Sequence, residues 1–262
     1  MSNGAPSNRL VRTRRGRIIR VPAQSHHQDP YAPDRSAKMG CALEPVRTGE
    51  GRHGMRSWLD RIKEPSCRES DVHYHVEEEQ SHLFHTFEGG SCEIEYLSLI
   101  NAIVQVAKPA LALETGTLHG FSALAIADAL ERNERGKLIS IDVADQGLAR
   151  QRLQAAGLAQ RVEWVQSESR EYLRAYAGLP FGFALLDSSV SDGTRIGEAE
   201  ILLSRRLVQG YIVLHDTSRY RAGYEPADEV QRYQVGLNHL AQQSAGQVRF
   251  PFSQGLTLLQ VS

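Results

Sequence analysis

Residues 110–142 read ALALETGTLHGFSALAIADALERNERGKLISID, and this stretch decides the fold. It begins with an apolar run at residues 110–114 that has the length and composition of a short strand. A turn with two glycines follows, and residues 121–131 then have the composition of a helix. Residues 137–142 form a second apolar run of strand length. Together these segments predict a strand–helix–strand unit whose two strands are parallel.

The same alternation continues on both sides of this unit. Further strands are predicted at residues 162–165, 181–186 and 211–214, and further helices at residues 96–107, 146–158, 170–176, 199–207 and 227–241. Strands separated by helices of about 10 to 15 residues are typical of an open, doubly wound parallel sheet. Residues 247–252 and 256–261 are apolar runs too close together for a crossover, so they predict an antiparallel hairpin at the C-terminus. Such a hairpin is less expected of a nicotinamide dehydrogenase.

Composition and charge exclude several classes of protein. The chain has 262 residues, of which 41% are hydrophobic and 23% charged, as in ordinary globular domains. Its 30 basic and 31 acidic residues give a net charge of −1, which offers no support for a nucleic-acid partner. Three cysteines without a CxxC pair predict neither a disulfide framework nor a zinc site and favour a cytoplasmic location. No apolar stretch is long enough for a signal peptide or a membrane span, so no membrane association is expected.

The composition changes near residue 93. We expect a partly flexible N-terminal extension in residues 1–54, a helical lid or substrate wall in residues 55–92, and the main domain in residues 93–262. Residues 9–20 contain six arginines, which either contact an anionic partner or form a solvated tail. Trp58, Leu59 and Ile62 suggest an amphipathic helix that docks on the domain or across a dimer interface.

Four histidines lie close together in the second of these segments, at His73, His75, His82 and His85. The spacing of the last two would allow metal ligation from a helix. The alternative is a set of surface histidines beside the acidic residues 77–79. No zinc-protease motif accompanies them, which favours the surface interpretation.

Candidate functional residues follow the predicted strands, because ligands of open α/β sheets bind at the carboxyl ends of the strands. The turn at residues 114–120 reads E-T-G-T-L-H-G, where Gly116 permits close backbone approach and Gly120 opens a helix. It is either a cofactor cradle or an ordinary strand-to-helix turn. Because Glu114 is acidic and a third glycine is missing, the turn suits a cationic group better than a pyrophosphate.

Two more strand ends carry polar residues with two possible roles each. Asp142 could accept both hydrogens of a ribose diol, or it could cap the next helix. Glu168 and Ser169 follow the third strand, where they could contact an adenine ring or begin a helix as its cap.

Taken together, four segments resemble the class I S-adenosylmethionine-dependent methyltransferases. The segments are E-T-G-T-L-H-G at 114–120, Ile141-Asp142, Leu186-Asp187 and Val213-Leu214-His215-Asp216. More narrowly, they are similar to the small-molecule O-methyltransferases that include sugar and macrolide enzymes. The resemblance implies a Rossmann-like, mostly parallel seven-stranded sheet with a terminal antiparallel hairpin. It also implies S-adenosylmethionine as cofactor, a hydroxyl of a sugar, polyketide or other natural product as methyl acceptor, and a homo-oligomer such as a dimer.

The resemblance also assigns roles to individual residues. Those implied to bind the cofactor are Glu114, Thr115, Gly116, Thr117, Gly120 and Ser122 at the methionine portion, Asp142 at the ribose, Glu168 or Ser169 at the adenine, and Asp187 beneath the amino group. His215, Asp216 and Asp187 are implied to be catalytic at the acceptor.

The acceptor hydroxyl must lose a proton during an SN2 methyl transfer, and two routes are open. His215 is a candidate general base. Alternatively, Asp187 and Asp216 could hold Mg²⁺, which prefers oxygen ligands and would acidify the hydroxyl. The sequence departs from metal-dependent relatives because Ser188-Ser189 follows Asp187 where many have Asp-His, and Thr217 stands where some have Asn. The need for a metal therefore stays open.

Two other functions compete with this hypothesis. Asp142 would also suit an NAD(P)-dependent oxidoreductase, but the third glycine and a Tyr-x-x-x-Lys pair are missing. A non-catalytic methyltransferase-like binding protein is the other alternative, against which His215 and Asp216 argue. Methylation of nucleic acid is not expected, because no Asn-Pro-Pro-Tyr-like motif follows the fourth strand.

Overall fold

The computed structural model describes residues 9–12, 18–21, 58–61, 68–69, 84–87, 91–190, 193–218 and 227–261. The chain divides into two compact units, residues 1–53 and residues 54–262. In the first unit the structure describes an antiparallel pair of strands, β1 (Arg9–Arg12) and β2 (Ile18–Val21). The candidate site lies in the second unit.

The second unit is built on a seven-stranded sheet in the order β10-β11-β9-β8-β5-β6-β7. Its strands are β5 (Leu111–Thr115), β6 (Lys137–Asp142), β7 (Val162–Gln166), β8 (Phe181–Leu186), β9 (Val208–His215), β10 (Gly246–Phe250) and β11 (Leu256–Gln260). Strands β5 to β9 are mutually parallel, whereas β11 is antiparallel to both β9 and β10. The predicted mostly parallel sheet with a C-terminal antiparallel hairpin is confirmed.

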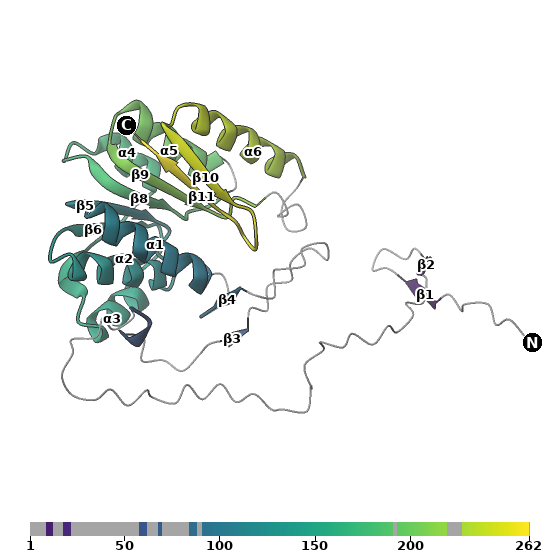
Figure 1. Cartoon of the computed structure of the whole chain (residues 1–262), viewed down its shortest axis with the longest axis horizontal. Coiled ribbons are helices and arrows are strands. Elements are labelled where there is room, and N and C mark those ends of the chain that lie inside the picture. Colours follow the sequence, from purple (N-terminus) through teal and green to yellow (C-terminus); the bar gives the residue numbers. More distant parts are fainter. Residues whose placement is uncertain are drawn as a thin grey trace, which may run out of the picture. The chain divides into compact units, whose positions relative to one another are not determined.

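Helices cover both faces of the sheet (Figure 1). The helices are α1 (Ile94–Ala107), α2 (Phe121–Arg132), α3 (Gly147–Ala155), α4 (Ser169–Ala175), α5 (Thr194–Ser204) and α6 (Ala227–Gln242). The first three pack on one face and the last three on the other, each around its own buried apolar cluster. Successive residues of a strand pack into opposite clusters: Ala112 belongs to the first cluster and Leu113 to the second.

Local sequence explains where the helices end. Helix α1 ends at Ala107 because Lys108 adopts a left-handed conformation, with φ of 48°, directly before Pro109. The helices predicted at residues 146–158 and 199–207 both end earlier than expected, at Ala155 and Ser204, and the second also begins earlier, at Thr194. Gly157 and Arg206 have positive φ values of 70° and 53°, which ordinary helical residues do not adopt, and each lies just beyond the observed helix end.

The described residues before Ser91 pack through aromatic side chains. A single 3-10 turn, η1 (Trp58–Arg61), carries Trp58, which is buried edge-on against Phe87 with ring centroids 6.2 Å apart. Phe87 in turn stacks on Phe121, the first residue of α2, at 4.6 Å. Two short strands, β3 (Arg68–Glu69) and β4 (His85–Thr86), pair beside this contact. Of the expected amphipathic helix, the structure describes a 3-10 turn at Trp58–Arg61, and Ile62 lies outside the described residues.

The histidine group is described only at His85, since His73, His75 and His82 lie outside the described residues. His85 is exposed and belongs to a strand, so it lacks the helical geometry that metal ligation at this spacing would need. Its Nδ1 lies 2.8 Å from Oε1 of Glu95. Separately, none of the helices in the described ranges combines the length and apolarity of a membrane-spanning segment.

Candidate active site

A cavity of about 530 Å³ opens at the carboxyl ends of β5 to β9. Strand β5 has β6 on one side and β8 on the other, so the chain order reverses here, which is where ligands of such sheets bind. The sequence-predicted residues on its wall are Gly116, Thr117, Gly120, Ser122, Asp142, Glu168, Ser169, Asp187 and Asp216. Glu114, Thr115 and His215 do not line it. Ser91, Cys92 and His119 line the wall without having been predicted.

The turn after β5 is shaped by its two glycines. Gly116 has φ of 81°, and a Cβ there would lie 2.2 Å from the carbonyl oxygen of Asp187. Gly120 caps α2 with φ of 79°, and a Cβ there would lie 2.6 Å from the Cβ of Ala149. Both positions therefore require glycine, and the first brings the turn against the end of β8.

Asp142 holds the same turn from the end of β6. Its Oδ2 accepts hydrogen bonds from the amides of Thr117 and Leu118 at 2.8 and 3.1 Å, and its Oδ1 accepts one from Ala144 at 2.9 Å. Helix α3 is capped by Gln146, so Asp142 does not cap it. A carboxylate offers about four acceptor sites, which leaves capacity for a ribose hydroxyl.

Glu114 lies behind the turn and is fully buried. Its Oε2 accepts a hydrogen bond from the Ser140 hydroxyl at 2.5 Å, while its Oε1 has no partner among the described residues. Burial raises the pKa of this carboxyl to about 7, and hydrogen bonds from Ser122 and Ser140 offset only part of that effect. Ser122, on the cavity wall, separates Glu114 from the cavity.

Glu198 of α5 connects three loops around the cavity, and the sequence analysis missed it. It is buried and accepts hydrogen bonds from the hydroxyls of Thr115, at 3.0 Å, Ser188, at 2.8 Å, and Ser169. Burial raises its pKa above the ordinary range for a glutamate. The side chain thereby ties the ends of β5 and β8 to the start of α4.

Glu168 caps helix α4, which is one of the two roles that the sequence left open for it. Its carboxylate accepts a hydrogen bond from the amide of Glu171 at 2.7 Å and pairs with Arg170 at 3.0 Å. Burial alone would raise the pKa of this carboxyl, but the hydrogen bonds outweigh it and lower the pKa. Because the residue also lines the cavity, a contact with an adenine ring stays a prediction.

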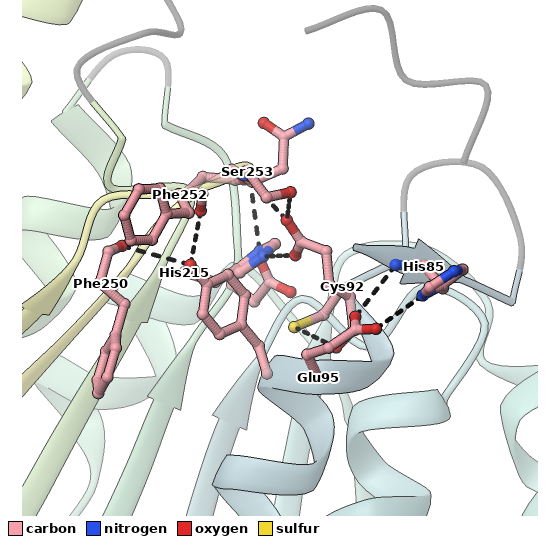
Figure 2. Close-up of polar contacts among 12 residues, drawn as sticks. His85, Cys92, Glu95, His215, Phe250, Phe252 and Ser253 are labelled. Carbon is pink, nitrogen blue, oxygen red and sulfur yellow. Dashed lines mark hydrogen bonds and ion pairs between the residues drawn. The ribbon is translucent and has the colours of Figure 1, made fainter. Parts of the chain in front are cut away.

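His215 lies between two carboxylates at the ends of β8 and α1. Its Nδ1 is 3.0 Å from Oδ1 of Asp187, and its Nε2 is 2.7 Å from Oε2 of Glu93. Figure 2 draws the polar contacts around His215, and the residue is 3% exposed. Burial lowers the pKa of the imidazole, but the negative charges of Asp187, Asp216 and Glu93 outweigh it and raise the pKa well above 6.5. Both ring nitrogens face carboxylates, and general-base action by His215 stays a prediction.

Glu93 joins this cluster to the C-terminal hairpin. Its Oε1 accepts hydrogen bonds from the amide of Gln254, at 2.9 Å, and from the hydroxyl of Ser253, in the turn drawn in Figure 2. Cys92 lies beside it as a free, buried thiol. Burial raises the pKa of this thiol to about 12, and its sulfur lies within 4.8 Å of ligand atoms of Glu93 and His215.

Arg195 of α5, also missed from the sequence, occupies the space between the two candidate metal ligands. Its guanidinium nitrogens lie 3.3 Å from Oδ1 of Asp187 and 3.3 Å from Oδ2 of Asp216. They also donate to the backbone carbonyls of Ser188 and His215. In this arrangement the two carboxylates do not fit Mg²⁺, because a guanidinium already bridges them.

The comparisons with known proteins concern the family and the fold. Residues 113–217 match the family model described as a methyltransferase domain. No curated protein sequence matches the chain. The sequence resemblance to class I methyltransferases is thus confirmed for the segment that runs from β5 to the end of β9.

Solved structures share the fold at low sequence identity. An O-methyltransferase from Bacillus cereus in complex with SAH superposes with a TM-score of 0.55 and 18% identity, covering 67% of this chain and 84% of that one. The O-methyltransferase TomG from Streptomyces achromogenes, in complex with SAM, gives 0.52 and 21%, covering 66% and 82%. The SAH-bound methyltransferase PaMTH1 from Podospora anserina gives 0.52 and 16%, covering 66% and 80%. The unit has the Rossmann-like methyltransferase fold.

Proposed function

We propose that the protein is an S-adenosylmethionine-dependent methyltransferase that acts on a hydroxyl of a small molecule. The observation that carries the proposal is the cavity at the switch point, where the Gly116 turn lies against the end of β8 and acidic residues line the wall. A cofactor with a sulfonium and an ammonium group is attracted by carboxylates, whereas a pyrophosphate would be repelled.

The wall fits the parts of this cofactor one by one. A side chain at Gly116 would collide with the backbone of Asp187, so glycine lets the turn lie against the end of β8, and Ser122 and Asp187 line the same cavity, where the methionine portion would bind. Asp142 lies where it could bind the ribose, and Glu168 and Ser169 where they could approach the adenine. Glu114, Thr115 and Thr117 would act by holding the turn, since the side chains of Thr115 and Thr117 bond to Glu198 and Ser140.

At the acceptor end, the cofactor would supply the methyl group and the protein would orient and deprotonate the acceptor. Bound S-adenosylmethionine supplies a methyl group on a positively charged sulfur. Asp187 and Asp216 line the cavity there and would accept a hydrogen bond from the acceptor hydroxyl, orient its oxygen and receive its proton as the new C–O bond forms. His215, behind the wall, would fix the orientation of Asp187.

Other features of the proposal go beyond the site itself. TomG is described as involved in tomaymycin synthesis, which supports a small-molecule acceptor and natural-product biosynthesis for this chain as well. A dimeric state, a cytoplasmic location and a lid or substrate wall in residues 55–92 stay predictions. So does Mg²⁺ dependence, against which the position of Arg195 argues.

Thermal unfolding with ligands tests the cofactor assignment. We expect S-adenosylhomocysteine at 100 times its Kd to stabilise the protein by about 2.7 kcal/mol and to raise its Tm by a few degrees, while NAD has no effect. A Tm increase with NAD or NADP and none with S-adenosylhomocysteine would instead identify an oxidoreductase.

Turnover separates an enzyme from a methyltransferase-like binding protein. Radiolabelled S-adenosylmethionine is incubated with a panel of phenols, sugars and polyketides, and methyl transfer is measured in the wild type and in Asp216→Asn. We expect transfer to a hydroxyl compound that falls about 100-fold or more in the variant, because its amide is a poor proton acceptor. Cofactor binding without transfer to any panel member would favour the non-catalytic alternative.

A further inference from the structure

The acceptor end of the cavity gathers three acidic side chains in a small volume. Ligand atoms of Asp187, His215 and Asp216 lie within 4.8 Å of one another, and Glu93 contacts the far side of the His215 ring. Carboxylates this close repel one another unless a positive charge lies between them. A divalent cation is one way to supply that charge, and a side chain is another.

Arg195 supplies it here. The side chain is 1% exposed, and the guanidinium contacts one oxygen of Asp187 and one of Asp216, each at 3.3 Å. Hydrogen bonds to the carbonyls of Ser188 and His215 attach the same two nitrogens to the backbone after β8 and at the end of β9. The charge is therefore fixed by two strand ends as well as by the ion pairs.

Among the described residues, two candidate neutral ligands beside the carboxylates already have other partners. His215 already has a carboxylate within hydrogen-bond distance of each ring nitrogen. The hydroxyl of Thr217, the residue after Asp216, accepts a hydrogen bond from Thr257 at 2.9 Å. A divalent ion would also have to lie beside a buried guanidinium, which cannot lose its proton to relieve the repulsion.

We propose that Arg195 is the built-in cation of the acceptor end, that it takes the place of a divalent metal ion between Asp187 and Asp216, and that the site excludes such ions. The proposal rests on the proposed function only in naming this end of the cavity as the acceptor end. Metal exclusion is measured without any methyl transfer, so it can fail or hold independently of that function.

The test measures binding of Mn²⁺ by the loss of its free electron paramagnetic resonance signal, with and without S-adenosylhomocysteine. The wild type is compared with Asp216→Asn, so that ions bound elsewhere cancel. We expect no difference between the two proteins up to 1 mM Mn²⁺, a concentration on the order of the weaker biological sites for divalent ions. One additional Mn²⁺ bound by the wild type and lost in Asp216→Asn would overturn the proposal.

Arg195→Met and Arg195→Lys show whether the guanidinium is the excluding group. Arg195→Met should gain one Mn²⁺ site at least tenfold tighter than any in the wild type, and the double variant with Asp216→Asn should lose it. Arg195→Lys keeps the positive charge and should gain none. Folding is verified by circular dichroism, and a folded Arg195→Met protein that gains no site would also overturn the proposal. If Arg195→Met does not fold, the comparison of the wild type with Asp216→Asn decides.

Discussion

Gly116 is the residue on which cofactor binding depends most directly. Replacement by alanine places a methyl group 2.2 Å from a backbone oxygen of Asp187, so the turn or the end of β8 must shift. We expect Gly116→Ala to weaken S-adenosylhomocysteine binding by at least tenfold, as measured by isothermal titration calorimetry.

Gly157→Ala is the matched control for that variant. Gly157 also has a positive φ, of 70°, but no atom lies within 4 Å of the position of its Cβ, and it does not line the cavity. It should lose about 1 to 2 kcal/mol of stability from backbone strain and bind as the wild type does. Equal binding by both variants would contradict the role given to the Gly116 turn.

Glu114 makes stability depend on pH in the ligand-free protein. Its pKa is raised from an ordinary value of 4.5 to about 7. Its favourable contribution to the free energy of unfolding is therefore complete below pH 4.5 and is lost as the pH rises through 7. Between pH 5 and 8 the wild type should therefore lose roughly 3 kcal/mol relative to Glu114→Gln, in urea unfolding experiments.

Glu131→Gln is a control for which the dependence of stability on pH should have the opposite sign. A hydrogen bond from Arg161 lowers the pKa of Glu131, so its contribution is present above its ordinary pKa and is lost only as the pH falls below that value. A free-energy difference between wild type and Glu114→Gln that stays constant from pH 5 to 8 would show that the carboxyl titrates normally.

Residues at strand ends could be predicted from the sequence, whereas those that hold them could not. Gly116, Asp142 and Asp187 each follow an apolar run directly, and the sheet brings such positions together. Arg195 and Glu198 lie inside helix α5, beyond the loop that follows β8. The signal for them exists, because they continue the buried stripe of α5 that Ala199 and Leu202 begin, but a charged residue on an apolar stripe does not reveal its partner.

At the scale of elements, strands were predicted more closely than helices. Strands β6 and β8 were predicted at the observed residues, because both are bounded by turns and almost all their residues are buried. The C-terminal ends of helices α3 and α5 were predicted too late in the chain, because apolar residues such as Leu158 and Leu207 also pack into the core from the loop after a helix. The spacing of apolar residues in the sequence indicates which residues are buried. Because buried residues continue past the last helical turn, the spacing does not mark where a helix ends.

The link between α1 and the hairpin offers a test of how elements are held together. Glu93 is fully buried and contacts both His215 and the turn before β11, whereas Glu95 on the same helix pairs with His85 at the surface. Removing one member of a buried pair leaves the other charge uncompensated. We expect Glu93→Ala to cost about 3 to 5 kcal/mol in chemical unfolding.

The matched surface variant sets the baseline for that measurement. Glu95→Ala removes an ion pair whose side chains are 47% and 39% exposed, and it should cost no more than about 1 kcal/mol. Similar losses in the two variants would mean that the Glu93 cluster does not hold the hairpin against α1.

At the scale of the whole molecule, the division of the chain after residue 53 predicts that the first unit can be removed while the second stays folded. A chain that begins at Gly54 keeps the entire second unit, including Trp58 and Phe87 in its apolar core. We expect it to unfold at a Tm within a few degrees of the full chain and to bind S-adenosylhomocysteine equally well, as measured by calorimetry.

A shorter chain that begins at Ser91 provides the contrast. It lacks both aromatic side chains that pack toward Phe121, so it should be destabilised by about 3 kcal/mol or more. Loss of binding already in the chain that begins at Gly54 would place part of the site in the first 53 residues.

The antiparallel course of β11 has a consequence for how such a site can diversify. Because Leu256 pairs with His215, the turn at residues 253–255 lies at the same edge of the sheet as the ends of the parallel strands. Two of its residues already contact Glu93, while none lines the cavity. Substitutions in this short turn would thus change the charge cluster behind the acceptor and leave the cofactor-binding residues unchanged. The turn is therefore a position at which evolution, or an engineer, can alter substrate choice.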